Sequence, residues 1–153
     1  MNLAKHNSKQ NFYVGAVVLK NDGILLIRQA KGHSLEYQWS IPWGSIEFGE
    51  APDKAALRET LEESNIQARV EGLIGIQNIG KHNSLGIIFL CKHQKGTPKP
   101  DGYETDRAKY FTLRQIEAFD EHIEVWCRWL IIRILPLQQK LWANTGSGKC
   151  PSS

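Results

Sequence analysis

Apolar positions along the chain follow two periods, and each period predicts a different element. Runs that are rich in β-branched and aromatic residues predict strands at 12–20, 24–29, 37–42, 67–79, 85–93 and 108–112. The turn Asn21-Asp22-Gly23 joins the first two strands as a hairpin, and we expect its positive φ at the Asp-Gly pair.

Helical periodicity appears in three other segments. The clearest helix is predicted over 51–64, where Pro52 suits a first helical turn and Ala51 is a poor N-cap. We expect its apolar stripe to be formed by Ala55, Ala56, Leu57 and Leu61. Two further helices are predicted over 113–119 and 121–142. This order of elements predicts an α/β or α+β sandwich with a mixed sheet.

The long C-terminal helix carries apolar residues at steps of three and four. These residues are Ile123, Trp126, Leu130, Ile134, Leu137 and Leu141. We expect this face to dock on the sheet. Trp129, Ile132 and Leu135 widen the apolar surface, so burial in a homodimer is the alternative.

Composition narrows the class of protein. The 153 residues suffice for one domain, expected over 12–142, with a flexible N-terminus at 1–11 and a disordered tail at 143–153. A net charge of +3, from 19 basic and 16 acidic residues, is too mild to favour nucleic acid as a partner. Three widely spaced cysteines predict neither a disulfide framework nor a zinc site, and favour a cytoplasmic setting. The most apolar segment, 129–135, includes Arg133 and is too short to span a membrane.

The predicted helix at 51–64 concentrates negative charge on one face. Glu62 and Glu63 follow Glu59 at three and four positions, so the three carboxylates lie close together. Arg58 can pair with Glu62 and relieves only part of the repulsion. A hard divalent cation would relieve the rest, and oxygen ligands select Mg²⁺ or Mn²⁺ over zinc. A solvated acidic face is the alternative for this segment taken alone.

The residues upstream of this helix extend the pattern. With them, the segment resembles the Nudix box, G-x5-E-x7-R-E-U-x-E-E-x-G-U, in which U is a bulky residue. The matching positions are Gly44, Glu50, Arg58, Glu59, Glu62, Glu63 and Ile66. Every charged position of the box is present, which makes this signal far more specific than a lone glycine motif.

Three positions depart from the family pattern. Thr60 stands at the first bulky position, and Asn65 replaces the second glycine. Asn65 ends the helix, where asparagine is the usual substitute for glycine in a left-handed conformation. Trp43 replaces a glycine that usually precedes the box, so we expect an ordinary φ at Trp43 and an indole that lines the mouth of the cleft.

The resemblance implies an α/β/α sandwich with a mixed sheet, in which the box forms a loop–helix–loop. It also implies Mg²⁺-dependent hydrolysis, with Mn²⁺ as the other candidate metal, of a diphosphate that links a nucleoside to another group. The implied metal ligands are Glu59, Glu63 and the Trp43 carbonyl, with Glu62 and Glu104 as further candidates. Arg58 would orient the carboxylates, and the general base would be Glu62 or Glu104.

The sequence says less about the identity of the substrate than about the metal site. The expected substrate is a nucleotide-type small molecule, such as ADP-ribose, a sugar nucleotide or a nucleoside triphosphate. The residues predicted to bind it are Arg28, Trp43 and Tyr103. Trp39 is expected to be a core residue instead. The alternative function is a catalytically silent module of the same fold that binds a ligand or regulates.

Overall fold

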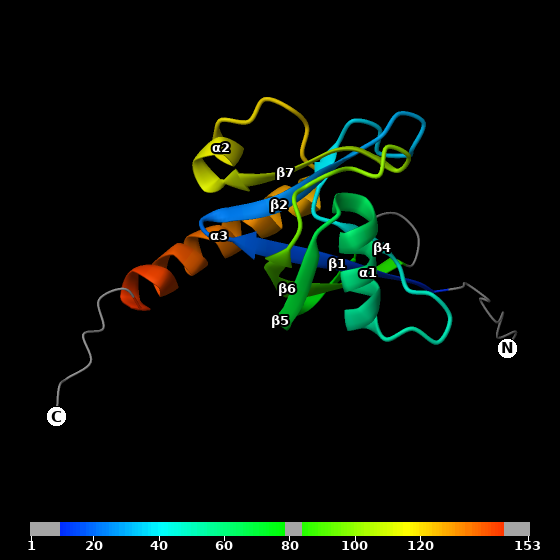
Figure 1. The fold of residues 1–153 in the computed structure, drawn as a ribbon, viewed down its shortest axis with the longest axis horizontal. Coiled ribbons are helices and arrows are strands. Elements are labelled where there is room, and N and C mark those ends of the chain that lie inside the picture. Colours follow the sequence, from blue (N-terminus) through cyan, green and yellow to red (C-terminus); the bar gives the residue numbers. More distant parts are fainter. Residues whose placement is uncertain (1–9, 79–83, 146–153) are drawn as a thin grey trace, which may run out of the picture.

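The strands form one mixed sheet in the computed structural model, which describes residues 10–78 and 84–145, with 138–145 described by backbone alone (Figure 1). The strands are β1 (Asn11–Lys20), β2 (Gly23–Gln29), β3 (Trp39–Ser40), β4 (Trp43–Ser45), β5 (Gln67–Asn78), β6 (Ser84–Lys95) and β7 (Thr105–Thr112). The central order is β3-β2-β1-β6-β5, while β4 also pairs with β1 and β7 with β2. Strands β1 and β6 run parallel, and the other paired strands run antiparallel.

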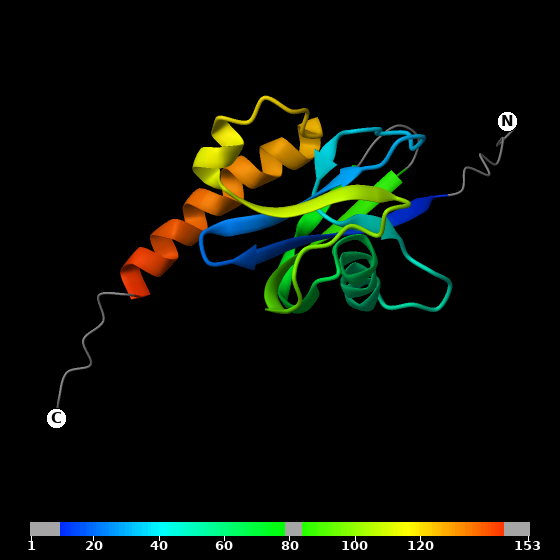
Figure 2. The same ribbon diagram turned by 45° about the horizontal axis from the view of Figure 1, so that its top comes forward.

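Helices cover both faces of this sheet. They are α1 (Pro52–Ser64), α2 (Leu113–Glu117) and α3 (Val125–Thr145). Side chains of β1 alternate between two cores: Val14 and Val18 join the α1 side, whereas Val17 and Leu19 join the α3 side. Figures 1 and 2 show α1 and α3 on opposite sides of the sheet. The predicted α/β sandwich with a mixed sheet is confirmed.

The β1–β2 hairpin forms as predicted, but the residue with a positive φ in its turn differs from the prediction. Lys20 pairs with Gly23 across a two-residue turn. The positive φ of 53° falls on Asn21, and Gly23 has no positive φ. The prediction that Asp-Gly supplies it is therefore wrong, because Asn21 also tolerates the left-handed region.

The buried face of α1 differs from the predicted apolar stripe. Leu61 is 44% exposed, although it was expected in the stripe. The buried side chains are those of Ala55, Ala56, Glu59, Thr60, Glu63 and Ser64. Small residues let α1 approach the sheet closely, and this approach turns the two carboxylates inward.

Helix α3 begins four residues later than predicted, at Val125 rather than Glu121. The preceding segment pairs with β3 instead: the Trp39 N–H donates to the His122 carbonyl at 2.8 Å, and the Glu124 N–H donates to the Trp39 carbonyl at 2.9 Å. Trp39 is 2% exposed, so its predicted place in the core is confirmed.

Helix α3 docks on the sheet as predicted, with its buried stripe shifted. The most buried side chains are those of Cys127, Leu130, Ile131 and Leu135. Leu137 was expected in this stripe and is 62% exposed, and the side chain of Leu141 lies outside the described set. The homodimer alternative rested on Trp129, Ile132 and Leu135. Leu135 does not fit it, because this side chain is 1% exposed and packs in the core between α3 and the sheet. Trp129 and Ile132 are exposed, and burial of these two in a homodimer stays a prediction.

The ends and the cysteines are described only in part. The predicted flexible ends lie mostly outside the described residues, although Asn11 belongs to β1 and residues 143–145 belong to α3. Cys91 and Cys127 are buried free thiols, whereas Cys150 lies outside the described residues. Within the described part of the chain, no helix is both long enough and apolar enough to cross a membrane.

Candidate active site

The site is built where β4 crosses α1. Strand β4 pairs antiparallel with β1, with Gly44 opposite Val14. A Cβ atom on Gly44 would lie 2.1 Å from the carboxyl carbon of Glu59 and 2.3 Å and 2.5 Å from its two oxygens. Any side chain at position 44 would therefore displace the Glu59 carboxylate, which packs directly on the backbone.

Glu63 is the most buried acid of the site, with 2% of its surface exposed. Its Oε2 accepts a hydrogen bond from the Trp43 N–H at 2.9 Å. Burial raises the pKa of the Glu63 carboxyl well above its ordinary value, the Trp43 N–H opposes this rise, and the charges of Glu59, Glu104 and Asp101 add to it. Desolvation also raises the pKa of Glu59, against the effect of Arg58.

Arg58 connects the acids of the box. Its Nε and Nη2 donate to the two carboxylate oxygens of Glu50, each at 2.9 Å. Its Nη1 donates to Glu59 at 2.8 Å and to Glu62 at 3.1 Å, and Nη2 also donates to the Ser45 carbonyl at 3.0 Å. The hydrogen bond from Arg58 lowers the pKa of Glu50. Arg58 thus fixes the carboxylates relative to β4, and Glu50 holds Arg58.

The loop before β7 brings another acid to this cluster. Asp101 Oδ1 accepts hydrogen bonds from the backbone N–H groups of Tyr103, Glu104 and Thr105 at 2.8–3.0 Å. The Thr105 hydroxyl donates to the Glu63 carbonyl at 2.9 Å, which ties the loop to the end of α1. The charge of Glu104 raises the pKa of both Glu59 and Glu63, so Glu104 lies within electrostatic reach of both.

The end of α1 is shaped by Asn65. This residue adopts the left-handed conformation, with φ 60° and ψ 22°, and its N–H donates to the Leu61 carbonyl at 2.9 Å. The left-handed conformation predicted for Asn65 at the helix end is confirmed. Trp43 does not have a positive φ, which confirms the ordinary backbone predicted for it.

The donor set of this cluster fits a hard divalent cation. Buried carboxylates are stable when they are paired with positive charge or bind a metal, and Glu63 has like charges around it. All side-chain donors are oxygens, which suits Mg²⁺ or Mn²⁺. Among the described residues, no three side chains lie together as a ready set of metal ligands, and Glu59 and Glu62 pair with Arg58.

The three residues predicted to bind substrate do not share one pocket. Arg28 donates to both oxygens of Asp106 at 2.8 Å and to Glu121 at 3.3 Å. Tyr103 is 76% exposed in the loop before β7. Trp43 packs against Tyr13 and Trp126, with ring centroids 5.5 Å and 6.4 Å away. Its Nε1 is buried without an acceptor among the described residues.

Sequence reasoning missed Asp101 and Thr105, which hold the loop that carries Glu104. The Asp101-Gly102 pair was a usable signal, because aspartate before glycine often accepts hydrogen bonds from the backbone that follows it. The bond between Thr105 and α1 joins residues 42 positions apart, and no local pattern reveals it.

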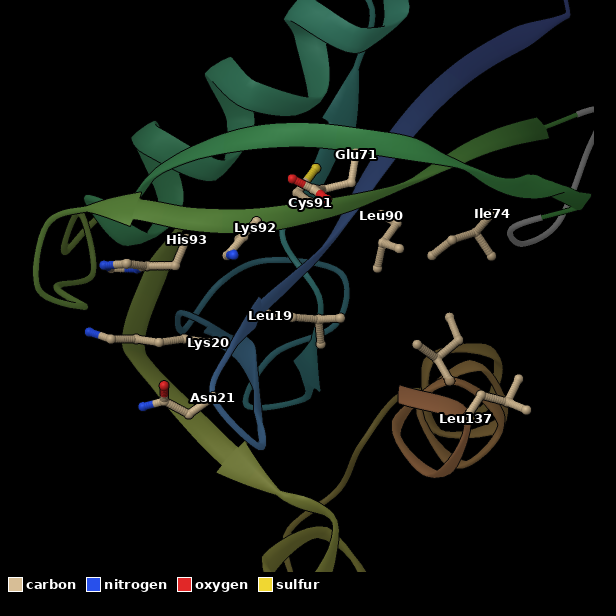
Figure 3. Close-up of a pocket in the computed structure, with 11 residues that line it drawn as sticks. Leu19, Lys20, Asn21, Glu71, Ile74, Leu90, Cys91, Lys92, His93 and Leu137 are labelled. Atoms are coloured by element: carbon tan, nitrogen blue, oxygen red, sulfur yellow. The ribbon is translucent and has the colours of Figure 1, made fainter. Parts of the chain in front are cut away.

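A hollow of about 600 Å³ lies between α3 and the sheet, away from the carboxylates. In Figure 3, Leu19, Ile74, Leu90 and Leu137 extend into the same space. It lies toward the Lys20 end of β1, whereas β4 pairs with the opposite end, at Tyr13–Gly15. This hollow is mainly apolar and is not the site of the acidic cluster.

The chain is similar in sequence to several known proteins. The chain is 28% identical to an ADP-ribose pyrophosphatase of Methanocaldococcus jannaschii over 124 residues, which is 76% of this chain and 72% of that protein. It is 31% identical to an RNA pyrophosphohydrolase of Cereibacter sphaeroides over 121 residues, covering 69% of this chain and 74% of that protein. A nudix hydrolase relative from Caenorhabditis elegans is 31% identical, and this chain spans 30% of its length.

Solved structures share the fold. A NUDIX hydrolase from Nitrosomonas europaea superposes with a TM-score of 0.77 at 21% identity, over 88% of this chain and 75% of that chain. A MutT NUDIX hydrolase from Burkholderia pseudomallei gives a TM-score of 0.71, over 82% and 98% of the two chains. The model of the NUDIX domain matches residues 9–130, most of the sequence, and the chain therefore belongs to the NUDIX family.

Proposed function

We propose that this protein is a divalent-metal-dependent hydrolase that cuts a pyrophosphate bond in a nucleoside diphosphate linked to another group. The observation that carries this proposal is the pair of buried carboxylates, Glu59 and Glu63, held against Gly44 and oriented by Arg58. A module that only binds a ligand would gain nothing from burying acids that repel each other. Relatives named for ADP-ribose and RNA pyrophosphate hydrolysis support the substrate class.

The chemistry explains why such a cluster is useful. A diphosphate is polyanionic and repels hydroxide, so catalysis must neutralise charge and orient water. Bound Mg²⁺ or Mn²⁺ supplies that neutralisation. Glu59, Glu63 and the Trp43 carbonyl would hold the ion, with Glu62 and Glu104 as further candidate ligands. Arg58 keeps the carboxylates in place, and Glu50 fixes Arg58.

The general base is Glu62 or Glu104. The side chain of Glu62 is 56% exposed and is bound only by Arg58 among the described residues, which leaves it able to reach a water. Glu104 projects from the loop tied to α1. The variants Glu62→Gln and Glu104→Gln distinguish a general base from a metal ligand. Loss of the base lowers kcat and removes the acidic limb of the pH profile while Mg²⁺ affinity is kept.

The proposal is tested by release of nucleoside monophosphate or phosphate from a substrate panel, with Mg²⁺, with Mn²⁺ and with chelator. The panel contains ADP-ribose, a sugar nucleotide, nucleoside triphosphates, a dinucleoside polyphosphate and 5′-triphosphate RNA. Metal-dependent turnover of at least one member is the expected result. Tight binding of one member without turnover of any would overturn the proposal in favour of the silent module.

A further inference from the structure

A separate hollow of about 570 Å³ adjoins the acidic cluster. It lies between the β2–β3 loop and the loop before β7, and Lys31, His33, Tyr37, Tyr103 and Asp106 are among its lining residues. Ala30, also in its wall, donates its N–H to the Glu104 carbonyl at 2.9 Å. The hollow therefore begins directly beside the acid that reaches the Glu59–Glu63 pair.

The lining of this hollow includes aromatic rings and one lysine, Lys31. Tyr37 is 45% exposed and Tyr103 is 76% exposed, and the His33 ring meets Tyr103 edge-on at 5.8 Å. Large exposed rings gathered around one hollow are typical of ligand sites. Lys31 has no ion pair among the described residues and adds a cation beside the rings.

Tyr37 is held in an unfavourable backbone conformation. Its φ is +61°, a region that bulky residues rarely adopt. The Tyr37 N–H donates to the Gln29 carbonyl at 3.0 Å, and the Arg28 guanidinium lies 5.3 Å from the ring centroid. Arg28 is itself fixed by both oxygens of Asp106. The surrounding contacts thus keep the ring at the hollow despite the backbone strain.

Tyr103 is fixed from the opposite loop. Its N–H donates to Asp101 at 2.9 Å, and its carbonyl lies 3.0 Å from His33 Nε2. Both tyrosines therefore have anchored backbones and exposed rings. Rigid exposed rings stabilise planar ligands by stacking at a small cost in side-chain entropy.

We propose that this hollow binds the nucleobase of the substrate, stacked on Tyr103 and Tyr37, with the diphosphate extending past Lys31 to the acidic cluster. The inference rests on the proposed function, because it assumes that a nucleotide diphosphate occupies the neighbouring centre. It assigns Arg28 a positioning role: its guanidinium is bound by Asp106 and Glu121 and supports Tyr37.

Two polar side chains of the hollow, those of Asp106 and His33, already have partners within the protein. Both oxygens of Asp106 accept from Arg28, and His33 Nε2 is paired with the Tyr103 carbonyl. Recognition therefore depends on the face of the base and not on its hydrogen-bonding edge. The substrate class is accordingly a nucleoside diphosphate derivative with either a purine or a pyrimidine, and a diphosphate without an aromatic base binds more weakly.

The test uses probes that cannot be hydrolysed: α,β-methylene-ADP, α,β-methylene-UDP and methylenediphosphonate, which has no base. Binding to the full chain is measured by titration calorimetry with Mg²⁺. Tyr103→Ala should weaken both nucleotide analogues about 5- to 100-fold and leave methylenediphosphonate unchanged. Tyr103→Phe should bind like the wild type, because the ring and not the hydroxyl makes the stack. Trp129→Ala removes another exposed ring, on α3 and outside this hollow, and should change nothing.

Tyr37→Ala should also weaken binding of the two nucleotide analogues. If that variant does not fold, the comparison of Tyr103→Ala with Tyr103→Phe still tests the inference. The inference is overturned if Tyr103→Ala binds the nucleotide analogues like the wild type, if it loses all three probes equally, or if the wild type binds none. Failure of the proposed function looks different: the analogues would still bind in a Tyr103-dependent way while no member of the substrate panel is hydrolysed.

Discussion

Helices α1 and α3 cover opposite faces of the same sheet, but α3 buries large apolar side chains, whereas α1 buries small side chains and two carboxylates. Helix α3 buries Leu130, Ile131 and Leu135, which stabilise the fold by removing apolar area from water. Helix α1 buries Glu59 at 8% exposure and Glu63 at 2%. Burial of a carboxylate costs several kcal/mol unless positive charge offsets it. Helix α3 therefore stabilises the fold, whereas the burial of Glu59 and Glu63 on α1 opposes folding.

The largest effect on the α3 side is expected from Ile131→Ala. Ile131 is fully buried, so the variant should lose about 2–5 kcal/mol of unfolding free energy. The neighbouring Ile132 is 48% exposed, and Ile132→Ala is the matched control with a much smaller loss. Chemical denaturation measures both. If Ile131→Ala lowered kcat of the folded enzyme while keeping stability, the division of roles between the helices would be wrong.

Glu124, just before α3, is a buried acid on the side of the sheet where the other buried side chains are mostly apolar. It is 8% exposed, one carboxylate oxygen has no partner among the described residues, and burial raises its pKa to about 7. A raised carboxyl pKa means that the folded state binds more protons, so stability falls as pH rises from about 4.5 through about 7.

The variant Glu124→Gln removes this dependence. It should stabilise the protein by up to about 3 kcal/mol at pH 8 and change little at pH 4.5. Melting temperatures measured across this range for wild type and variant give the comparison. Equal differences at both pH values would show that the charge of Glu124 is not the cause.

On the α1 side, Gly44→Ala should affect turnover more than stability. The added methyl group would meet the Glu59 carboxylate, which sits at the end of a flexible side chain and can move away. We expect a loss of about 10- to 100-fold in kcat, similar to losing support for a metal ligand, with a nearly unchanged melting temperature. Gly72→Ala is the control, because a Cβ atom at Gly72 has nothing within 4 Å. Wild-type turnover in Gly44→Ala would mean that the position of Glu59 is not critical.

Local chemistry made parts of this structure predictable from sequence. The spacing of the box placed Arg58 and its acids on one helix, and Asn65 ended that helix in the left-handed conformation expected of it. An ordinary φ at Trp43 also followed from its side chain alone. Each of these depends on contacts close in sequence or on one residue's conformational range.

Contacts distant in sequence explain the errors. Leu61 looked like a core position, but the approach of Gly44 to α1 turns Glu59 and Glu63 inward instead. The start of α3 was misplaced because pairing of Trp39 with residues 122–124 competes with the helix. The hollow beside Glu104 depends on Tyr37, whose unusual φ is sustained by Arg28 and Asp106 and has no local sequence signal.

The most direct test of the proposal that Glu63 is a metal ligand is Glu63→Gln, measured for turnover and stability on the same preparation. We expect Mg²⁺-dependent hydrolysis to fall by roughly 10³-fold or more, about 4 kcal/mol, while the melting temperature at neutral pH stays equal or rises, because burial disfavours the charged form of Glu63. Glu117→Gln, on the exposed face of α2, should change neither. Near wild-type turnover on a confirmed substrate, or a clear loss of stability with activity retained, would contradict it.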